Sequence, residues 1–136
     1  MTSLPEGSVL MRTWFGGADG DWESLVSAVR TPSEEGFLPA VEIVDDPAFD
    51  DLDAEALATA QPDPATVSFL ADRTTLTAAD RTILVVCTRP DEDESRPFRV
   101  VPAELWSVEN NLNLSNMDWE EFASAVGPDD VFRGFH

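Results

Sequence analysis

The side chains available for chemistry in this sequence are carboxylates, guanidiniums, hydroxyls and one thiol. The single histidine, His136, is the last residue, and the sequence contains neither lysine nor tyrosine. A chain-terminal imidazole is seldom held firmly enough to act as the base of a Ser-His-Asp or Cys-His system. Schiff-base chemistry requires a lysine and is excluded. These absences weigh against a conventional enzyme and favour a non-catalytic role.

One group of candidate residues is a run of acids at Asp45, Asp46, Asp50, Asp51 and Asp53. Their spacing matches a calcium-binding loop poorly, because the turn glycine and the bidentate glutamate are missing, and we expect no metal site. Residues 31–72 contain eleven Asp or Glu and no basic residue. This distribution predicts a strongly negative face that repels nucleic acids and anionic membranes and attracts a basic protein. The alternative is that the acidity only keeps the protein in solution.

A second candidate is the pair Asp72 and Arg73, which follows the apolar run of residues 66–71. That run predicts a central strand, and open α/β sheets often bind ligands beyond the carboxyl ends of such strands. Asp72 and Arg73 are therefore candidate contacts of a carboxylate-based enzyme or a small-ligand binder. The alternative is an ion pair that merely holds a loop together.

A third candidate is the region after Trp106, because all four asparagines of the sequence lie between residues 110 and 116. A helix over residues 102–111 and its continuation would direct Leu105, Val108 and Leu112 to the core. Beside them runs a second stripe, which comprises Trp106, Glu109, Asn110 and Asn113. A tryptophan next to amides suits recognition of a partner protein. The alternative is that Trp106 belongs to the core and the asparagines cap two helix ends.

Nine predicted elements must position these residues. Apolar and β-branched runs predict strands at residues 8–15, 37–44, 66–71, 82–88 and 98–101. Helical spacing and stop signals predict helices near residues 22–29, 52–60, 102–111 and 117–126, the last with Ser115 or Asn116 as its cap. The order β-α-β-α-β-β-β-α-α predicts an α/β or α+β fold. We expect a single domain over residues 1–136, with a mixed β-sheet of about five strands covered by about four helices.

The remaining composition indicates a cytoplasmic protein without a cofactor. The one cysteine, Cys87, lies in an apolar run, so we expect a buried, inert thiol and no internal disulfide. No apolar run is long enough to cross a membrane, and the first residues lack a signal-peptide pattern. The glycines at positions 16, 17 and 20 do not have the order of a phosphate-binding loop. Residues 89–97, rich in proline and acids, predict a solvated loop.

Several stretches carry a resemblance to a known family. They are residues 37–52, the run Phe69-Leu-Ala-Asp-Arg-Thr-Thr-Leu76, and above all Phe98-Arg-Val-Val-Pro-Ala-Glu-Leu-Trp-Ser-Val-Glu-Asn-Asn-Leu-Asn113 with residues 116–122 and 131–135. The sequence resembles a family of short acidic actinobacterial proteins over nearly its whole length. That family is a domain of unknown function. The resemblance implies a bacterial, cytoplasmic, single-domain protein and carries over no catalytic or binding residue.

These observations leave three functions open. The first is a non-catalytic protein-binding module, of inhibitor, immunity or regulatory type, that docks a basic partner on the acidic surface and the Trp106 region. The second is a carboxylate-based enzyme or small-ligand binder centred on Asp72 and Arg73, which requires a concave pocket and a carboxyl group whose pKa is raised by burial. The third is a structural component of a larger assembly.

Overall fold

The fold was analysed on a computed structural model, which describes residues 7–17, 19–33, 35–60, 67–87, 98–114 and 116–134. It contains one mixed sheet of six strands in the order β2-β1-β3-β4-β5-β6. The strands are β1 (Val9–Arg12), β2 (Glu42–Val44), β3 (Val67–Ala71), β4 (Ile83–Cys87), β5 (Phe98–Val100) and β6 (Val131–Phe132). The single mixed-sheet domain predicted from the sequence is confirmed, with one strand more than expected.

The sheet contains both parallel and antiparallel pairs. β1 runs parallel to both of its neighbours, β2 and β3, and β6 runs parallel to β5, whereas β3, β4 and β5 pair antiparallel in sequence order. All residues of β1 and β3 are buried, as expected for strands covered on both faces. The predicted central position of the strand at residues 66–71 is therefore confirmed.

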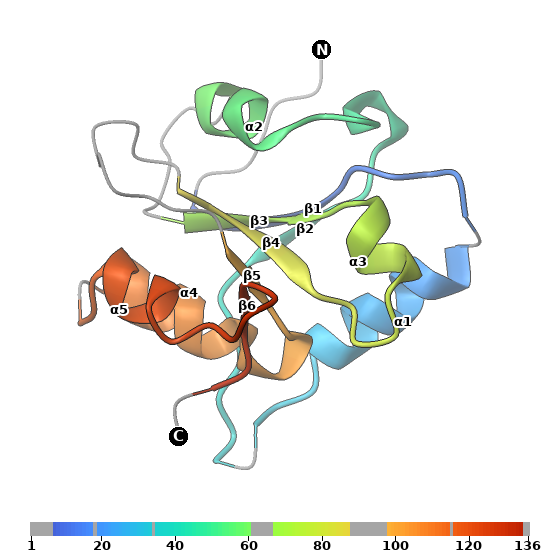
Figure 1. Cartoon of the computed structure of the whole chain (residues 1–136). Helices are drawn as coiled ribbons and strands as arrows, with labels where there is room; N and C mark the ends of the chain where they lie inside the picture. Colours follow the sequence, from blue (N-terminus) through green and yellow to red (C-terminus); the bar gives the residue numbers. More distant parts are fainter. Residues whose placement is uncertain are drawn as a thin grey trace.

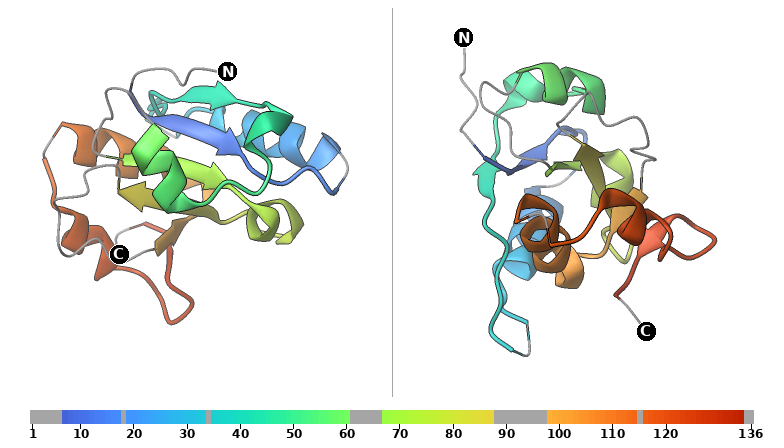
Figure 2. Two further views of the ribbon diagram at one scale, coloured as in Figure 1. Left: turned by 90° about the horizontal axis from the view of Figure 1, so that it is seen from above. Right: turned by 90° about the vertical axis from the view of Figure 1, so that its left-hand side faces the viewer.

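In the described part of the chain, five α-helices and two short 3-10 helices cover the sheet. The α-helices are α1 (Asp19–Val29), α2 (Ala54–Ala60), α3 (Arg73–Thr77), α4 (Leu105–Asn113) and α5 (Trp119–Ala123), and the 3-10 helices are η1 (Pro47–Phe49) and η2 (Pro102–Glu104). Figure 1 shows α2 on one side of the sheet and α1, α4 and α5 on the other, and the views of Figure 2 agree. The molecule is thus a three-layer arrangement with an uneven distribution of helices.

Side-chain alternation along β1 explains the two cores. Leu10 faces the larger core, where it packs with Trp22 and Leu25 of α1 and with residues of α4 and α5. Val9 and Met11 face the opposite side and pack with Leu57 of α2. Successive strand residues point to opposite faces, so a fully apolar strand serves both layers.

Several element boundaries differ from the predictions. The strand predicted at residues 37–44 forms only over Glu42–Val44, because Pro39 removes a ladder donor. The helix predicted at 117–126 is the shorter α5, and its N-cap is Asp118 rather than Ser115 or Asn116, through a capping box with Glu121. The helix predicted at 102–111 is split into η2 and α4.

Two elements were missed, and other predictions concern residues outside the described ranges. α3 was missed because its five residues are mostly threonines, which are poor helix formers. β6 was missed because two residues are too few to show a period. Cys87 is half-buried rather than buried. The loop predicted at residues 89–97, Ser115 and His136 lie outside the residues that the structure describes.

Candidate functional site

The three parallel strands create a switch point at their carboxyl ends. β1 lies between β2 and β3, and the two connections cross opposite faces of the sheet, one through α1 and the other through α2. The segments that follow β1 and β3 lead to α1 and α3, which contact each other on one face of the sheet. The carboxyl ends of parallel strands are the edge at which open α/β sheets bind ligands. Asp72 and Arg73 lie directly after β3, at the position that the sequence predicted.

A concave pocket of about 440 Å³ lies at this switch point, on the α2 side of the sheet. Its floor is apolar and includes Leu52, Leu70 and Leu84. Its rim is polar and carries both charges. The polar and aromatic lining residues, which we call the switch-point rim, are Thr13, Trp14, Asp51, Asp53, Asp72, Arg73 and Thr74.

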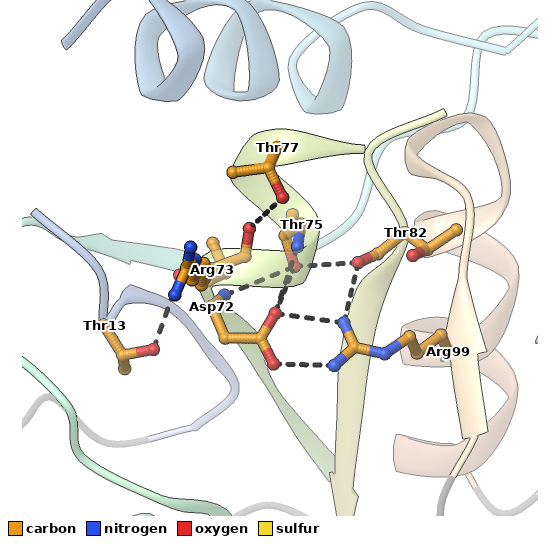
Figure 3. Close-up of polar contacts among 8 residues, drawn as sticks. Thr13, Asp72, Arg73, Thr75, Thr77, Thr82 and Arg99 are labelled. Carbon is orange, nitrogen blue, oxygen red and sulfur yellow. Dashed lines mark hydrogen bonds and ion pairs between the residues drawn. The ribbon is translucent and has the colours of Figure 1, made fainter. Parts of the chain in front are cut away.

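Asp72 is held by hydrogen bonds with Thr75 and Arg99 (Figure 3). Its carboxylate accepts from the Thr75 amide at 3.1 Å, and the Thr75 hydroxyl accepts from the Asp72 amide at 3.3 Å, so the two residues form the capping box of α3. Arg99 of β5 donates to both carboxylate oxygens, at 3.0 and 2.6 Å. The same guanidinium also donates to the carbonyl of Thr82 at 3.0 Å.

These contacts lower the pKa of Asp72. Burial alone raises the carboxyl pKa, but the hydrogen bonds and charge of Arg99, together with the Thr75 bonds, outweigh burial and hold the pKa below its ordinary value. The enzyme hypothesis required a carboxyl group with a raised pKa, and Asp72 does not meet that requirement. An ionised, bidentate Asp72 is a positioning group rather than a proton donor.

Arg73 and Trp14 form the aromatic part of the rim. The Arg73 guanidinium lies 5.9 Å from the Trp14 ring centroid, a cation–π arrangement. The backbone of Gly16 and Gly17 passes so close to the indole that a Cβ atom at Gly17 would lie 2.7 Å from the ring. The glycine pair is therefore required by the position of Trp14, since any larger residue would displace the indole.

The predicted acidic run wraps around this end of the sheet. The Asp51 amide donates to the carbonyl of Thr13 at 2.8 Å, which ties the run to the end of β1. Asp46 caps η1 through the Ala48 amide at 3.0 Å, and Asp53 accepts from the Ala56 amide at 2.8 Å at the start of α2. Asp50 follows η1 and is exposed. Asp51 and Asp53 thus reach the same pocket as Asp72 and Arg73, whereas Asp46 and Asp50 do not line it.

Asp45 belongs to a different cluster, around a residue that sequence reasoning missed. Arg12, the last residue of β1, has a side chain that is 5% exposed. It donates to Asp19 at 2.9 Å, to Asp45 at 3.4 Å and to the carbonyl of Trp14 at 3.2 Å. Its guanidinium also lies 4.4 Å from the Phe15 ring centroid. The available signal was a single arginine at the end of an otherwise apolar strand.

The stripe around Trp106 is covered by another segment of the chain. Trp106 stacks on Phe37 with ring centroids 4.8 Å apart and planes 16° apart. Glu109 is buried and accepts from the Ala40 amide and, at 2.9 Å, from the Asn113 side chain, which also donates to Ser8 at 2.7 Å. Asn110 donates to the Trp106 carbonyl at 2.8 Å, within the helix. These side chains hold α4 against residues 37–41 and β1, and this differs from capping, the role expected in the structural alternative.

The predicted candidates therefore separate into three places. Asp51, Asp72 and Arg73 share the switch-point pocket, Asp45 joins Arg12 on the other side of the sheet, and the Trp106 stripe is distinct from both. Within the described ranges, no group of three or more His, Cys, Asp or Glu side chains is arranged to hold a metal ion. No helix in the described part of the chain has the length and apolarity needed to cross a membrane.

The sequence from residue 7 to residue 135 matches the model of the family described as Domain of unknown function (DUF6924). The chain belongs to this family. The match confirms the resemblance found in the sequence. No curated protein matches the DUF6924 chain in sequence. DUF6924 membership brings no catalytic or binding residue with it, so the function must be argued from the pocket and its charges.

Proposed function

We propose that the protein is a non-catalytic binding module that recognises a basic partner protein at the switch-point rim. The observation that carries the proposal is the convergence of Asp51, Asp53 and Asp72 on one concave pocket above a leucine floor. A lysine or arginine side chain is complementary to this pocket, because its apolar methylene stem matches the floor and its cationic end matches the acidic rim. An inhibitor, immunity protein or regulator would use such a pocket to hold one basic residue of its target.

The charges around the pocket support a positively charged partner. Seven acids lie between Glu42 and Glu55, and none of them is fully buried. Six of these seven acids are exposed, and one of them, Asp45, pairs with Arg12. A surface with this excess of carboxylates accelerates encounters with basic proteins and rejects acidic ones.

The role of Asp72 in this proposal is to position the rim. Its ion pair with Arg99 and its capping box with Thr75 fix the start of α3, which carries Arg73 and Thr74 on the rim. Asp51 and Asp53, which are exposed, then supply the carboxylates that contact the partner. We infer further that the protein acts in the cytoplasm, because a sequence with one cysteine has no internal disulfide.

The small-ligand alternative is favoured by the same pocket, because Asp51, Asp53, Asp72 and Arg73 converge as it required. In this alternative the ligand is a small cation, which occupies the pocket and makes no contact with the acidic surface around it. The two functions are separated by whether a free guanidinium compound binds as well as an arginine-containing peptide does.

The test is a titration with a short arginine-rich peptide, followed by tryptophan fluorescence, in low and high salt. We compare the wild type with the double variant Asp51→Asn, Asp53→Asn. Asparagine retains hydrogen-bond acceptors and tolerates the positive φ of 64° at Asp51. The control is Glu120→Gln with Asp130→Asn, which removes the same charge from exposed positions outside the pocket.

The proposal expects affinity for the peptide to fall about tenfold in the pocket variant and to change little in the control, since rim charges act locally once screened. Binding by both variants equal to that of the wild type would refute a role for the pocket. Equal affinity for methylguanidinium and for the peptide would replace the protein-binding proposal with the small-ligand alternative.

A further inference from the structure

A second cavity, of about 490 Å³, lies on the opposite side of the sheet from the switch-point pocket. It is a groove between α1 and the edge strand β2. One wall carries Trp22 and Val26, one helical turn apart on α1, and Arg30, which directly follows α1. The other wall carries Ile43. Buried Arg12 also lines this groove. We call it the α1–β2 groove.

Arg12 has hydrogen-bonding capacity left within the groove. A guanidinium has five N–H donors, and the contacts of Arg12 with described residues use three of them, toward Asp19, Asp45 and the Trp14 carbonyl. Of the two carboxylates, Asp19 is 81% exposed and Asp45 is 44% exposed, while the Arg12 side chain is 5% exposed. Burying a guanidinium beside such exposed partners is costly, and a ligand carboxylate in the groove would accept the remaining donors.

The groove lining carries both charges, and in addition to Arg12, Asp19 and Asp45 it includes one more cation and one more anion. Arg30, near the end of α1, is an exposed second cation on the lining. Glu23, from the same helix, and Asp45, after β2, are exposed anions on the lining. The lining also includes the apolar side chains of Val26 and Ile43. A smaller hollow of about 150 Å³ adjoins Arg30 and Ile43 and extends the apolar lining with residues 38–41.

We propose that the α1–β2 groove binds a free α-amino acid with an apolar side chain. Its carboxylate accepts from Arg30 and from the remaining donors of Arg12. Its ammonium group donates to Glu23 and Asp45. Its side chain packs on Val26 and Ile43 and reaches toward the adjoining hollow. This site is independent of the basic partner proposed above, since it lies on the other face of the sheet and uses none of the switch-point rim.

The test uses isothermal titration calorimetry with L-leucine as the probe. Two analogues each remove one charge: leucinamide lacks the carboxylate, and 4-methylpentanoate lacks the ammonium group. We expect L-leucine to bind at least about tenfold more tightly than either analogue, because each lost charge-assisted hydrogen bond leaves a lining group unpaired. The absence of saturable binding by L-leucine, L-isoleucine and L-phenylalanine would overturn the proposal, as would equal affinity for the analogues.

Variants on the groove rim give an independent readout. Arg30→Gln is expected to weaken binding of L-leucine about tenfold, and Arg133→Gln, which removes an exposed arginine elsewhere, to leave it unchanged. Glu23→Gln should weaken binding of L-leucine but not of 4-methylpentanoate, since only the former carries an ammonium group. Both rim residues are exposed, so the variants retain the fold, as circular dichroism will verify. Wild-type affinity in Arg30→Gln would refute the assignment.

Discussion

Asp72 illustrates, at the residue scale, how one side chain serves two parts of the fold. Through Thr75 it begins α3, and through Arg99 it joins that helix to β5. The Asp72–Arg99 ion pair contributes more to stability than an exposed salt bridge does, because both side chains are largely shielded from solvent and the contact is bidentate. The sequence marked Asp72 by its place after a strand, but its partner Arg99 is distant along the chain and no local pattern pointed to it.

Asp72→Asn is expected to lower the free energy of unfolding by about 1–2 kcal/mol at pH 7, because it retains a cap and loses a charge-assisted contact. The folded-state pKa of Asp72 is lowered, so this stabilisation is complete above the ordinary carboxyl value of about 3.9 and is lost as pH falls through the folded value. Urea unfolding at a series of pH values measures it. The wild type and the variant should converge in acid; a difference that persists unchanged there would contradict the ion-pair explanation.

The segment over residues 37–41 matters at the element scale, because it covers α4 without being a strand. Its attachments to α4 include the stacking of Phe37 on Trp106, the bond from the Ala40 amide to Glu109 and a bond from Asn110 to the Leu38 carbonyl. Phe37 remains 50% exposed, so the segment is fastened at few points. Segments with few buried contacts open at lower free energy than the core.

Phe37→Ala is therefore expected to cost about 0.5–1.5 kcal/mol, the usual range for an aromatic pair, and to speed hydrogen exchange of the Ala40 amide. Native-state exchange followed by NMR measures the local effect, and urea unfolding the global one. Leu114→Ala is the matched control, because Leu114 is an exposed apolar residue without this stacking role. Unchanged protection at Ala40 in Phe37→Ala would show that the stack does not hold the segment.

Periodicity and turn signals predicted the elements whose periodic apolar residues form the buried face, such as α1 with Trp22, Leu25 and Val29. They failed where tertiary contacts decide, as at α3, whose threonines become helical because Asp72 and Arg99 fix its start. The same limit applied to the sites. Asp72 and Arg73 were predicted from their place directly after a central strand. Arg12 was not predicted, because its role depends on α1 and β2, which pack around it.

The net charge of -19 affects the stability of the whole molecule. Carboxylates that repel one another destabilise a compact chain, and salt screens that repulsion over about 10 Å at 0.1 M. We expect the melting temperature to rise by several degrees between about 0.02 and 0.5 M sodium chloride. Differential scanning fluorimetry measures it, with choline chloride as a control for specific sodium binding. A melting temperature that is independent of both salts would mean that the acids are too far apart to repel each other.

The place of β1 between β2 and β3 also affects how the chain folds during synthesis. Leu10 pairs with Ile43 on one side and Phe69 on the other, so both partners of this wholly buried strand are synthesised after it. Such distant, parallel pairings form slowly, because long loops must close first. A growing or truncated chain that ends before β3 therefore leaves one edge of this apolar strand unpaired. Chaperone binding to the nascent chain should centre on this strand and cease once Ala71 has left the ribosome.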